Sequence, residues 1–192
     1  MMALPASIVV APHHVVYLIS SYRTKQYLLN NQIPASLPHL YLINHPFSSR
    51  DLNNMPGRSH VEVPHLGGTT AAYQTSGDLD PSKPTLVMVN SFLTNSNLYG
   101  SQYANENLTK NMNLIAIELL GHGETRTKNE NWTYWDTATM NVQVLEALEK
   151  RGEIGGKIFV LGTSQGGWIT ARMALLAPDK VCELIKLTDR EP

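Results

Sequence analysis

The sequence predicts an α/β fold in which a mostly parallel sheet carries helices on both faces. Three observations predict it: short apolar runs typical of strands buried on both sides, helical patterns between these runs, and a glycine-rich turn that joins one run to a helix. The 192 residues suffice for one compact domain. Because 42% of them are hydrophobic and only 16% charged, the composition excludes an intrinsically disordered chain.

The regular part of the sequence begins with a hairpin. Segments 60–63 and 69–75 are short strand candidates, and the Gly67-Gly68 pair between them is typical of a turn. The apolar run 84–89 follows and predicts a strand buried on both faces, as does the run 114–120. We therefore expect two antiparallel strands followed by the first strands of a parallel sheet.

The second half of the chain alternates helices with strands. Thr133 and Asp136 form a capping-box pattern, and apolar residues recur after it at helical spacing as far as Gly152. A third buried strand is expected over 158–161, a helix over 165–177 and a further strand over 181–187. This alternation predicts parallel strands joined by helical crossovers.

The first 54 residues differ in composition from the rest. They contain four charged residues and no glycine, whereas all 13 glycines follow Met55. Prolines interrupt any long helix there, and no polar-apolar alternation persists. We therefore divide the chain into an unassigned leader, 1–54, and a domain over 55–192 with Met55 as its natural start.

Composition also excludes several classes of function. Fifteen Lys and Arg balance 16 Asp and Glu, so no basic patch favours nucleic acid. The single cysteine, Cys182, excludes an internal disulfide and suits a reducing compartment. An uncharged N-terminal stretch is too short for a membrane span, and the histidines lack a metal-binding pattern. We expect a cytoplasmic protein without a cofactor, metal ion or membrane partner.

The strongest chemical motif is G-x-S-x-G, formed by Gly162, Ser164 and Gly166 between a predicted strand and a predicted helix. On such a tight turn the glycines permit close backbone approach, and the serine hydroxyl faces outward. The helix directs its first amides at the same place, which makes the Gln165 N–H a donor for a developing oxyanion. The alternative is a glycine-rich turn with only a structural role.

A second oxyanion donor must come from the loop after the first buried strand, over 89–96, because that strand ends at the same edge of the sheet. The Phe92 N–H is the candidate. The alternative, that Asn90 and Ser91 make only turn hydrogen bonds, stays open on this segment alone.

The segment 119–125 places a histidine between two glycines. It lacks the third glycine of a dinucleotide-binding loop and a Walker lysine, which argues against nucleotide binding. His122 is either a general base or, as we favour, a turn histidine whose ring is already hydrogen bonded.

Segments 87–92, 118–125, 162–167 and 177–181 together resemble the α/β-hydrolase superfamily, and the resemblance extends over about residues 59–188. The residues of several motifs are similar to those of fungal hydrolases from secondary-metabolite gene clusters, including clusters that make host-selective toxins. The resemblance implies a serine hydrolase with Ser164 as nucleophile and the Phe92 and Gln165 amides as oxyanion hole. An ester, thioester or lactone would be its small-molecule substrate.

The sequence departs from that family in two places. Asn90-Ser91 replaces the usual His-Gly, and all seven histidines precede Ser164, although the family places its catalytic histidine after the nucleophile. We therefore expect a C-terminally truncated fold that lacks the last strands and the cap, and an enzyme crippled by the missing base. The alternative is a non-catalytic remnant that binds a partner. An exposed sheet edge would favour a homo-oligomer, and a longer form could be peroxisomal.

Overall fold

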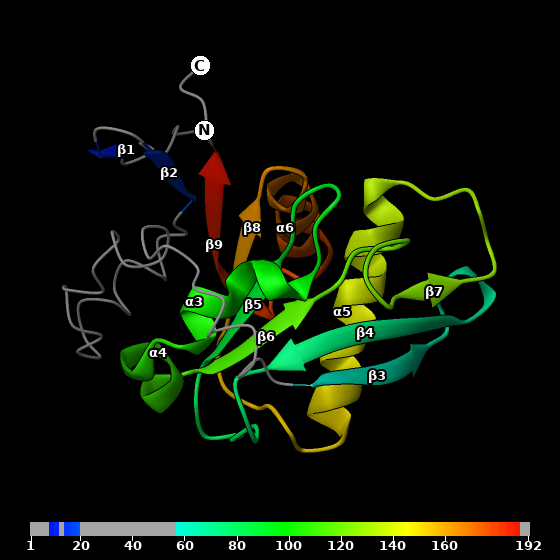
Figure 1. Cartoon of the computed structure of the whole chain (residues 1–192), viewed down its shortest axis with the longest axis horizontal. Helices are drawn as coiled ribbons and strands as arrows, with labels where there is room; N and C mark the ends of the chain where they lie inside the picture. The colour runs from blue at the N-terminus through cyan, green and yellow to red at the C-terminus, as the bar shows by residue number, and fades with distance from the viewer. Residues whose placement is uncertain (1–7, 12–13, 20–56, 189–192) are drawn as a thin grey trace.

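The computed structural model describes residues 8–11, 14–19 and 57–188, with side chains for 57–182 (Figure 1). The described strands form one sheet in the order β1-β2-β9-β8-β5-β6-β4-β3, and β7 also pairs with β4. The strands are β1 (Ile8–Ala11), β2 (His14–Ile19), β3 (Arg58–Val63), β4 (Thr69–Thr75), β5 (Thr85–Val89), β6 (Asn113–Ile117), β7 (Arg126–Thr127), β8 (Ile158–Thr163) and β9 (Val181–Thr188).

The centre of the sheet is the predicted parallel layer. Strands β6, β5, β8 and β9 run parallel, and every residue of β5 and β6 is buried. The predicted hairpin is β3 and β4, which pair antiparallel and attach to β6 through β4. Strand β6 ends at Ile117, earlier than predicted, because the next amides leave the parallel ladder: the Leu119 N–H donates to the Asn90 side chain.

Helices cover both faces of the sheet, as predicted (Figure 1). On one face α5 (Tyr134–Lys150) and α6 (Gln165–Leu176) pack with Val87 and Val89 in one apolar core. Leu86 and Met88 point to the opposite face, where Tyr99 and Leu108 complete a second core. The elements there are η2 (Ser96–Tyr99), α3 (Gly100–Tyr103) and α4 (Glu106–Asn111). The alternation follows from the two-residue period of a strand.

The elements that were not predicted are η1 (His65–Gly67), α3, β7 and two further groups. The short helices η2 and α4 are preceded by Asn95 and Asn105, whose side chains accept amide hydrogen bonds as N-caps. Both helices are too short to give a periodic pattern. Helix α5, in contrast, has the predicted capping box at Thr133 and Asp136. The second group is β1 and β2, which fall within the leader that carried no assigned fold.

The expected open edge beside β9 is occupied, which corrects the prediction of an unpaired final strand. Strand β2 pairs antiparallel with β9 from Val15 opposite Thr188 to Ile19 opposite Leu184, and β1 continues the sheet beyond it. Residues 184–188 of β9 are therefore paired on that side. The predicted start at Met55 lies outside the described residues. None of the described helices has the length and apolarity that crossing a membrane requires.

Candidate active site

Ser164 lies on the sharp turn between β8 and α6, and its side chain is exposed. Its backbone has φ 51° and ψ −115°, a left-handed conformation that few non-glycine residues adopt. It makes no side-chain capping hydrogen bond. A Cβ added at Gly162 would overlap the Gly166 backbone, so the predicted reason for these glycines is confirmed. The turn holds a strained serine outward at the carboxyl end of the parallel strands.

The Gln165 amide lies at the N-terminus of α6, as predicted. Gln165 is the first residue of that helix, where backbone N–H groups lack intrahelical acceptors. The backbone after Ser164 is drawn in tightly, because the Gly167 N–H donates to the Ser164 carbonyl at 2.9 Å. A helix N-terminus also supplies partial positive charge. This position suits a donor to a negative oxygen near the serine.

Phe92 lies in a turn at the end of β5, the strand next to β8. The Thr94 N–H donates to the Ser91 carbonyl at 3.3 Å, so that Phe92 and Leu93 are the two central residues of the turn. Leu93 has φ 59°, and the residue is 81% exposed. A positive φ at the second central position is typical of a type II turn, which favours glycine there. Residues 90–96, which we call the Phe92 loop, thus include a second strained residue.

Asn90 organises the Phe92 loop from inside. Its side chain is fully buried, and Nδ2 donates to the Thr94 carbonyl at 2.7 Å and the Ser91 carbonyl at 3.1 Å. Its Oδ1 accepts from the Leu119 N–H at 3.3 Å. Asn90 therefore makes the turn hydrogen bonds that the alternative interpretation expected, and it also joins this loop to the end of β6.

Tyr99 connects the end of β5 to the nucleophile turn. Its buried hydroxyl donates to the Val89 carbonyl at 2.6 Å and lies 3.4 Å from the Thr163 hydroxyl, one residue before Ser164. Burial raises the pKa of the Tyr99 hydroxyl far above its ordinary value, so the group stays protonated and remains a donor. This contact fixes the spacing of β5 and β8 where both strands end.

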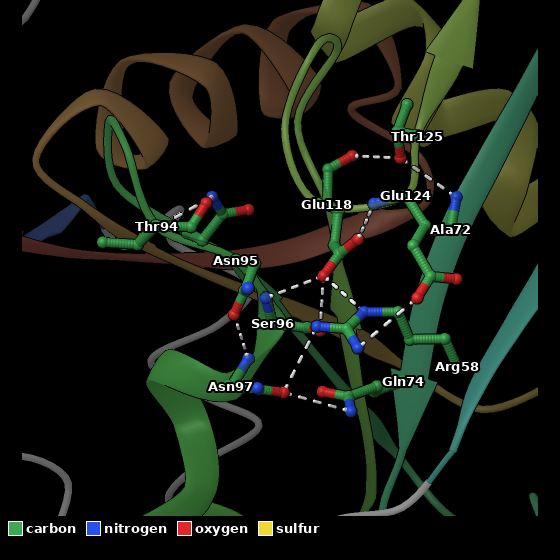
Figure 2. Close-up of polar contacts among 12 residues, drawn as sticks. Arg58, Ala72, Gln74, Thr94, Asn95, Ser96, Asn97, Glu118, Glu124 and Thr125 are labelled. Atoms are coloured by element: carbon green, nitrogen blue, oxygen red, sulfur yellow. Dashed lines mark hydrogen bonds and ion pairs between the residues drawn. The ribbon is translucent and has the colours of Figure 1, made fainter.

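Sequence reasoning missed Glu118, the most highly connected side chain near these loops (Figure 2). Its carboxylate has no exposed surface and accepts from the Ser96 N–H and hydroxyl, the Glu124 N–H and the Arg58 guanidinium. Burial raises the pKa of this carboxyl, but the hydrogen bonds from Glu124, Arg58 and Ser96 outweigh it and lower the pKa below its usual value. The available signal was a lone acidic residue within the apolar run 114–120.

The described histidines do not hydrogen bond to Ser164. His122 Nδ1 lies 3.0 Å from the Leu120 carbonyl, and its ring meets the Phe92 ring edge to face with centroids 5.9 Å apart. His60 pairs with Glu124 at 3.0 Å, and His65 with Asp136 at 3.1 Å. The favoured interpretation of His122 as a turn histidine with a hydrogen-bonded ring agrees with this geometry.

Exposed aromatic side chains gather around the same end of the sheet. Trp132 packs over Gly121, where an added Cβ would lie 2.7 Å from its ring, and Trp168 occupies the first turn of α6. The Arg172 guanidinium lies 5.6 Å from the Tyr134 ring centre and 5.2 Å from that of Trp135. Its Nη1 donates to the Trp168 carbonyl at 2.8 Å. The Arg172 ring contacts join α6 to the N-terminal end of α5.

Across residues 57–182, the His, Cys, Asp and Glu side chains form no group of three that could hold a metal ion.

Comparisons with known proteins agree with the fold. The model of the alpha/beta hydrolase fold family matches residues 84–187, which include β5, the Phe92 loop, Glu118 and the Ser164 turn. No curated protein matches the sequence significantly.

Solved structures share the fold. A carboxylesterase of Nitrososphaera gargenis is 26% identical with a TM-score of 0.55, covering 64% of this chain and 42% of its own. A hydrolase of Pseudomonas aeruginosa is 25% identical (TM-score 0.53; 64% and 43%). A thermophilic esterase of Thermogutta terrifontis is 21% identical (TM-score 0.53; 64% and 43%). The chain spans less than half the length of each. With its family match over more than half of its residues, the chain belongs to the alpha/beta hydrolase fold family.

Proposed function

We propose that this chain is a serine hydrolase-like protein acting on an ester, thioester or lactone, with Ser164 as nucleophile. The observation that carries the proposal is the strained, exposed Ser164 between β8 and α6. In an attack, its Oγ would bond to the substrate carbonyl carbon while the carbonyl oxygen takes the electron pair. The Phe92 and Gln165 amides would stabilise that negative oxygen. When the carbonyl re-forms, the bond to the alcohol or thiol would break, and that group would take up the proton lost from Ser164. Water would then hydrolyse the acyl-serine and restore the hydroxyl.

The proposed nucleophile needs a base to take its proton, and the chain offers a poor choice. All seven histidines precede Ser164, and the three with described side chains are engaged with Glu124, Asp136 and the Leu120 carbonyl. Loss of the base from a serine triad lowers the rate about 10⁶-fold, and oxyanion stabilisation with binding retains about 10³-fold over water. We therefore propose slow turnover by this chain alone.

The biological role of the protein is inferred from the residues of its motifs. We infer a role in small-molecule or toxin biosynthesis, because the segments around Phe92, Gly121, Trp135 and Ser164 are similar to those of fungal secondary-metabolite hydrolases. The esterases among the similar structures support an ester substrate.

A fluorophosphonate probe tests the nucleophile. The unsubstituted chain should be labelled at Ser164, slowly because no base activates the hydroxyl. Ser164→Ala should not be labelled, and Ser59→Ala, at an exposed serine of β3, should be labelled at the same rate as the unsubstituted chain. Hydrolysis of p-nitrophenyl esters by the same three proteins measures turnover. A folded chain that is neither labelled nor active above Ser164→Ala would contradict the proposal.

A non-catalytic binding module is the second candidate, and the engaged histidines favour it. It predicts ester hydrolysis equal to that of Ser164→Ala, together with a stable oligomer in size-exclusion chromatography. Turnover that depends on Ser164 would exclude it.

A further inference from the structure

The Glu118 carboxylate accepts hydrogen bonds from four donor groups. Ser96 gives two hydrogen bonds, from its N–H at 3.1 Å and its hydroxyl at 2.7 Å, and both reach Oε1. Arg58 Nε reaches the same oxygen at 2.9 Å, and the Glu124 N–H reaches Oε2 at 2.7 Å. Figure 2 shows these contacts converging on one side chain. A fully buried carboxylate is stable only when its oxygens are paired in this manner.

The donors come from three separate segments of the chain. Ser96 closes the Phe92 loop, Glu124 belongs to the turn that carries His122, and Arg58 begins β3. The turn passes close to the carboxylate at Gly123, where φ is 52° and an added Cβ would overlap the Glu118 carboxylate. The backbone path at Gly123 is therefore shaped around this group.

The Phe92 loop is held at both ends. Its first residue, Asn90, is anchored by the hydrogen bond from the Leu119 N–H to Asn90 Oδ1, and its last residue, Ser96, is anchored by Glu118. Between these anchors lies the turn with the strained Leu93. A strained backbone persists only where its surroundings over-determine it. Leu119 follows Glu118 directly, so both anchors come from the same end of β6.

We propose that Glu118 is a positioning residue that holds the Phe92 amide in the orientation an oxyanion requires. This inference rests on the proposed function, because it assigns Glu118 to the oxyanion hole of that reaction. Glu118 acts through Ser96 and does not touch the substrate. Its loss would lower the stabilisation of the developing oxyanion while substrate binding is retained, so kcat should fall and KM should stay nearly constant.

The informative variant is Glu118→Gln. Glutamine preserves the shape of the side chain, but an NH₂ group replaces one carboxylate oxygen. This NH₂ donor must face either the Ser96 and Arg58 donors or the Glu124 N–H. Ser96→Ala is the milder variant, since it removes only the hydroxyl contact. Glu118→Asp retains the charge with a shorter reach and tests rescue. Glu106→Gln, at the exposed end of an ion pair with Lys110, is the matched control.

Two readouts are measured on the full chain: hydrogen exchange of the 91–97 amides, with α5 amides as an internal reference, and Ser164-dependent ester hydrolysis. We expect Glu118→Gln and Ser96→Ala to speed exchange over 91–97 at least tenfold with α5 unchanged. We expect Glu118→Gln to lower kcat at least tenfold with KM within twofold, and Glu118→Asp to recover part of kcat.

The outcomes separate the two proposals. Unchanged exchange over 91–97 in both variants, or unchanged kcat, would overturn the role of Glu118. If the unsubstituted chain shows no Ser164-dependent turnover, the proposed function fails, and exchange over 91–97 alone then decides whether Glu118 positions the loop. If Glu118→Gln does not fold, Ser96→Ala decides by the same two measurements.

Discussion

Gly166 lies against the end of β5 so closely that a Cβ there would lie 2.7 Å from the Asn90 carbonyl oxygen and closer still to that of Val89. These are the carbonyls that lead into the Phe92 loop. The first turn of α6 therefore packs directly on the strand that carries the second proposed oxyanion donor. This contact, together with the Tyr99 hydrogen bond to the Val89 carbonyl, sets the distance between the two halves of the candidate site.

Gly166→Ala should be strongly destabilising, by at least about 3 kcal/mol, since backbone atoms on both sides must move. The free energy of unfolding from urea titration measures it. Gly57→Ala is the control, because nothing lies within 4 Å of an added Cβ there, and it should change stability by less than about 0.5 kcal/mol. Equal effects at the two sites would show that the described packing is incorrect.

Ser164→Gly should be more stable than Ser164→Ala by about 1 kcal/mol, because glycine adopts φ 51° without the steric cost that a Cβ imposes. Both variants lack the hydroxyl, so the comparison isolates backbone strain. Chemical denaturation of the two measures it. At the exposed Glu146 within α5 the order should reverse, with alanine more stable than glycine by about 1 kcal/mol. The same order at both positions would contradict the strained turn.

Acid should destabilise the protein through Glu118. Its folded-state pKa is lowered, so its contribution is present above the unfolded pKa, near 4.5, and is lost as the pH falls through the folded value. The gap in unfolding free energy between the unsubstituted chain and Glu118→Gln should therefore narrow below about pH 4.5. Denaturation between pH 7 and pH 3 measures it. Glu106→Gln, at an exposed carboxyl, should give no such narrowing, and a constant gap for Glu118→Gln would refute the linkage.

Arg172 should couple energetically to Trp135. Its guanidinium lies 5.2 Å from the Trp135 ring centre, a distance at which cation–π attraction contributes about 1 kcal/mol. A double-mutant cycle with Arg172→Met and Trp135→Leu should give a coupling of about 0.5–1 kcal/mol. Arg151→Met, at the far end of α5, should add to Trp135→Leu without coupling. A coupling free energy of zero between Arg172 and Trp135 would contradict a stabilising cation–π interaction.

The sequence was most informative where local chemistry fixes local structure. The buried strands, the capping box at Thr133 and the Ser164 turn each depend on a few adjacent residues, and the structure confirms these elements. The role of Glu118 escaped prediction because its partners Arg58, Ser96 and Glu124 lie up to 60 residues away in sequence. The pairing of β2 with β9 is likewise a long-range contact, and no local pattern encodes it.

All three tryptophans, Trp132, Trp135 and Trp168, lie at the end of the sheet where Ser164 is exposed, and each retains between 39% and 56% of its surface. The intrinsic fluorescence of this protein consequently originates from one region and from indoles in contact with solvent. Its emission should be red-shifted in the native state, and a small molecule settling near the serine should quench it or shift it to shorter wavelengths. Tryptophan fluorescence can therefore report the binding of a small molecule near Ser164, and a titration needs no added dye.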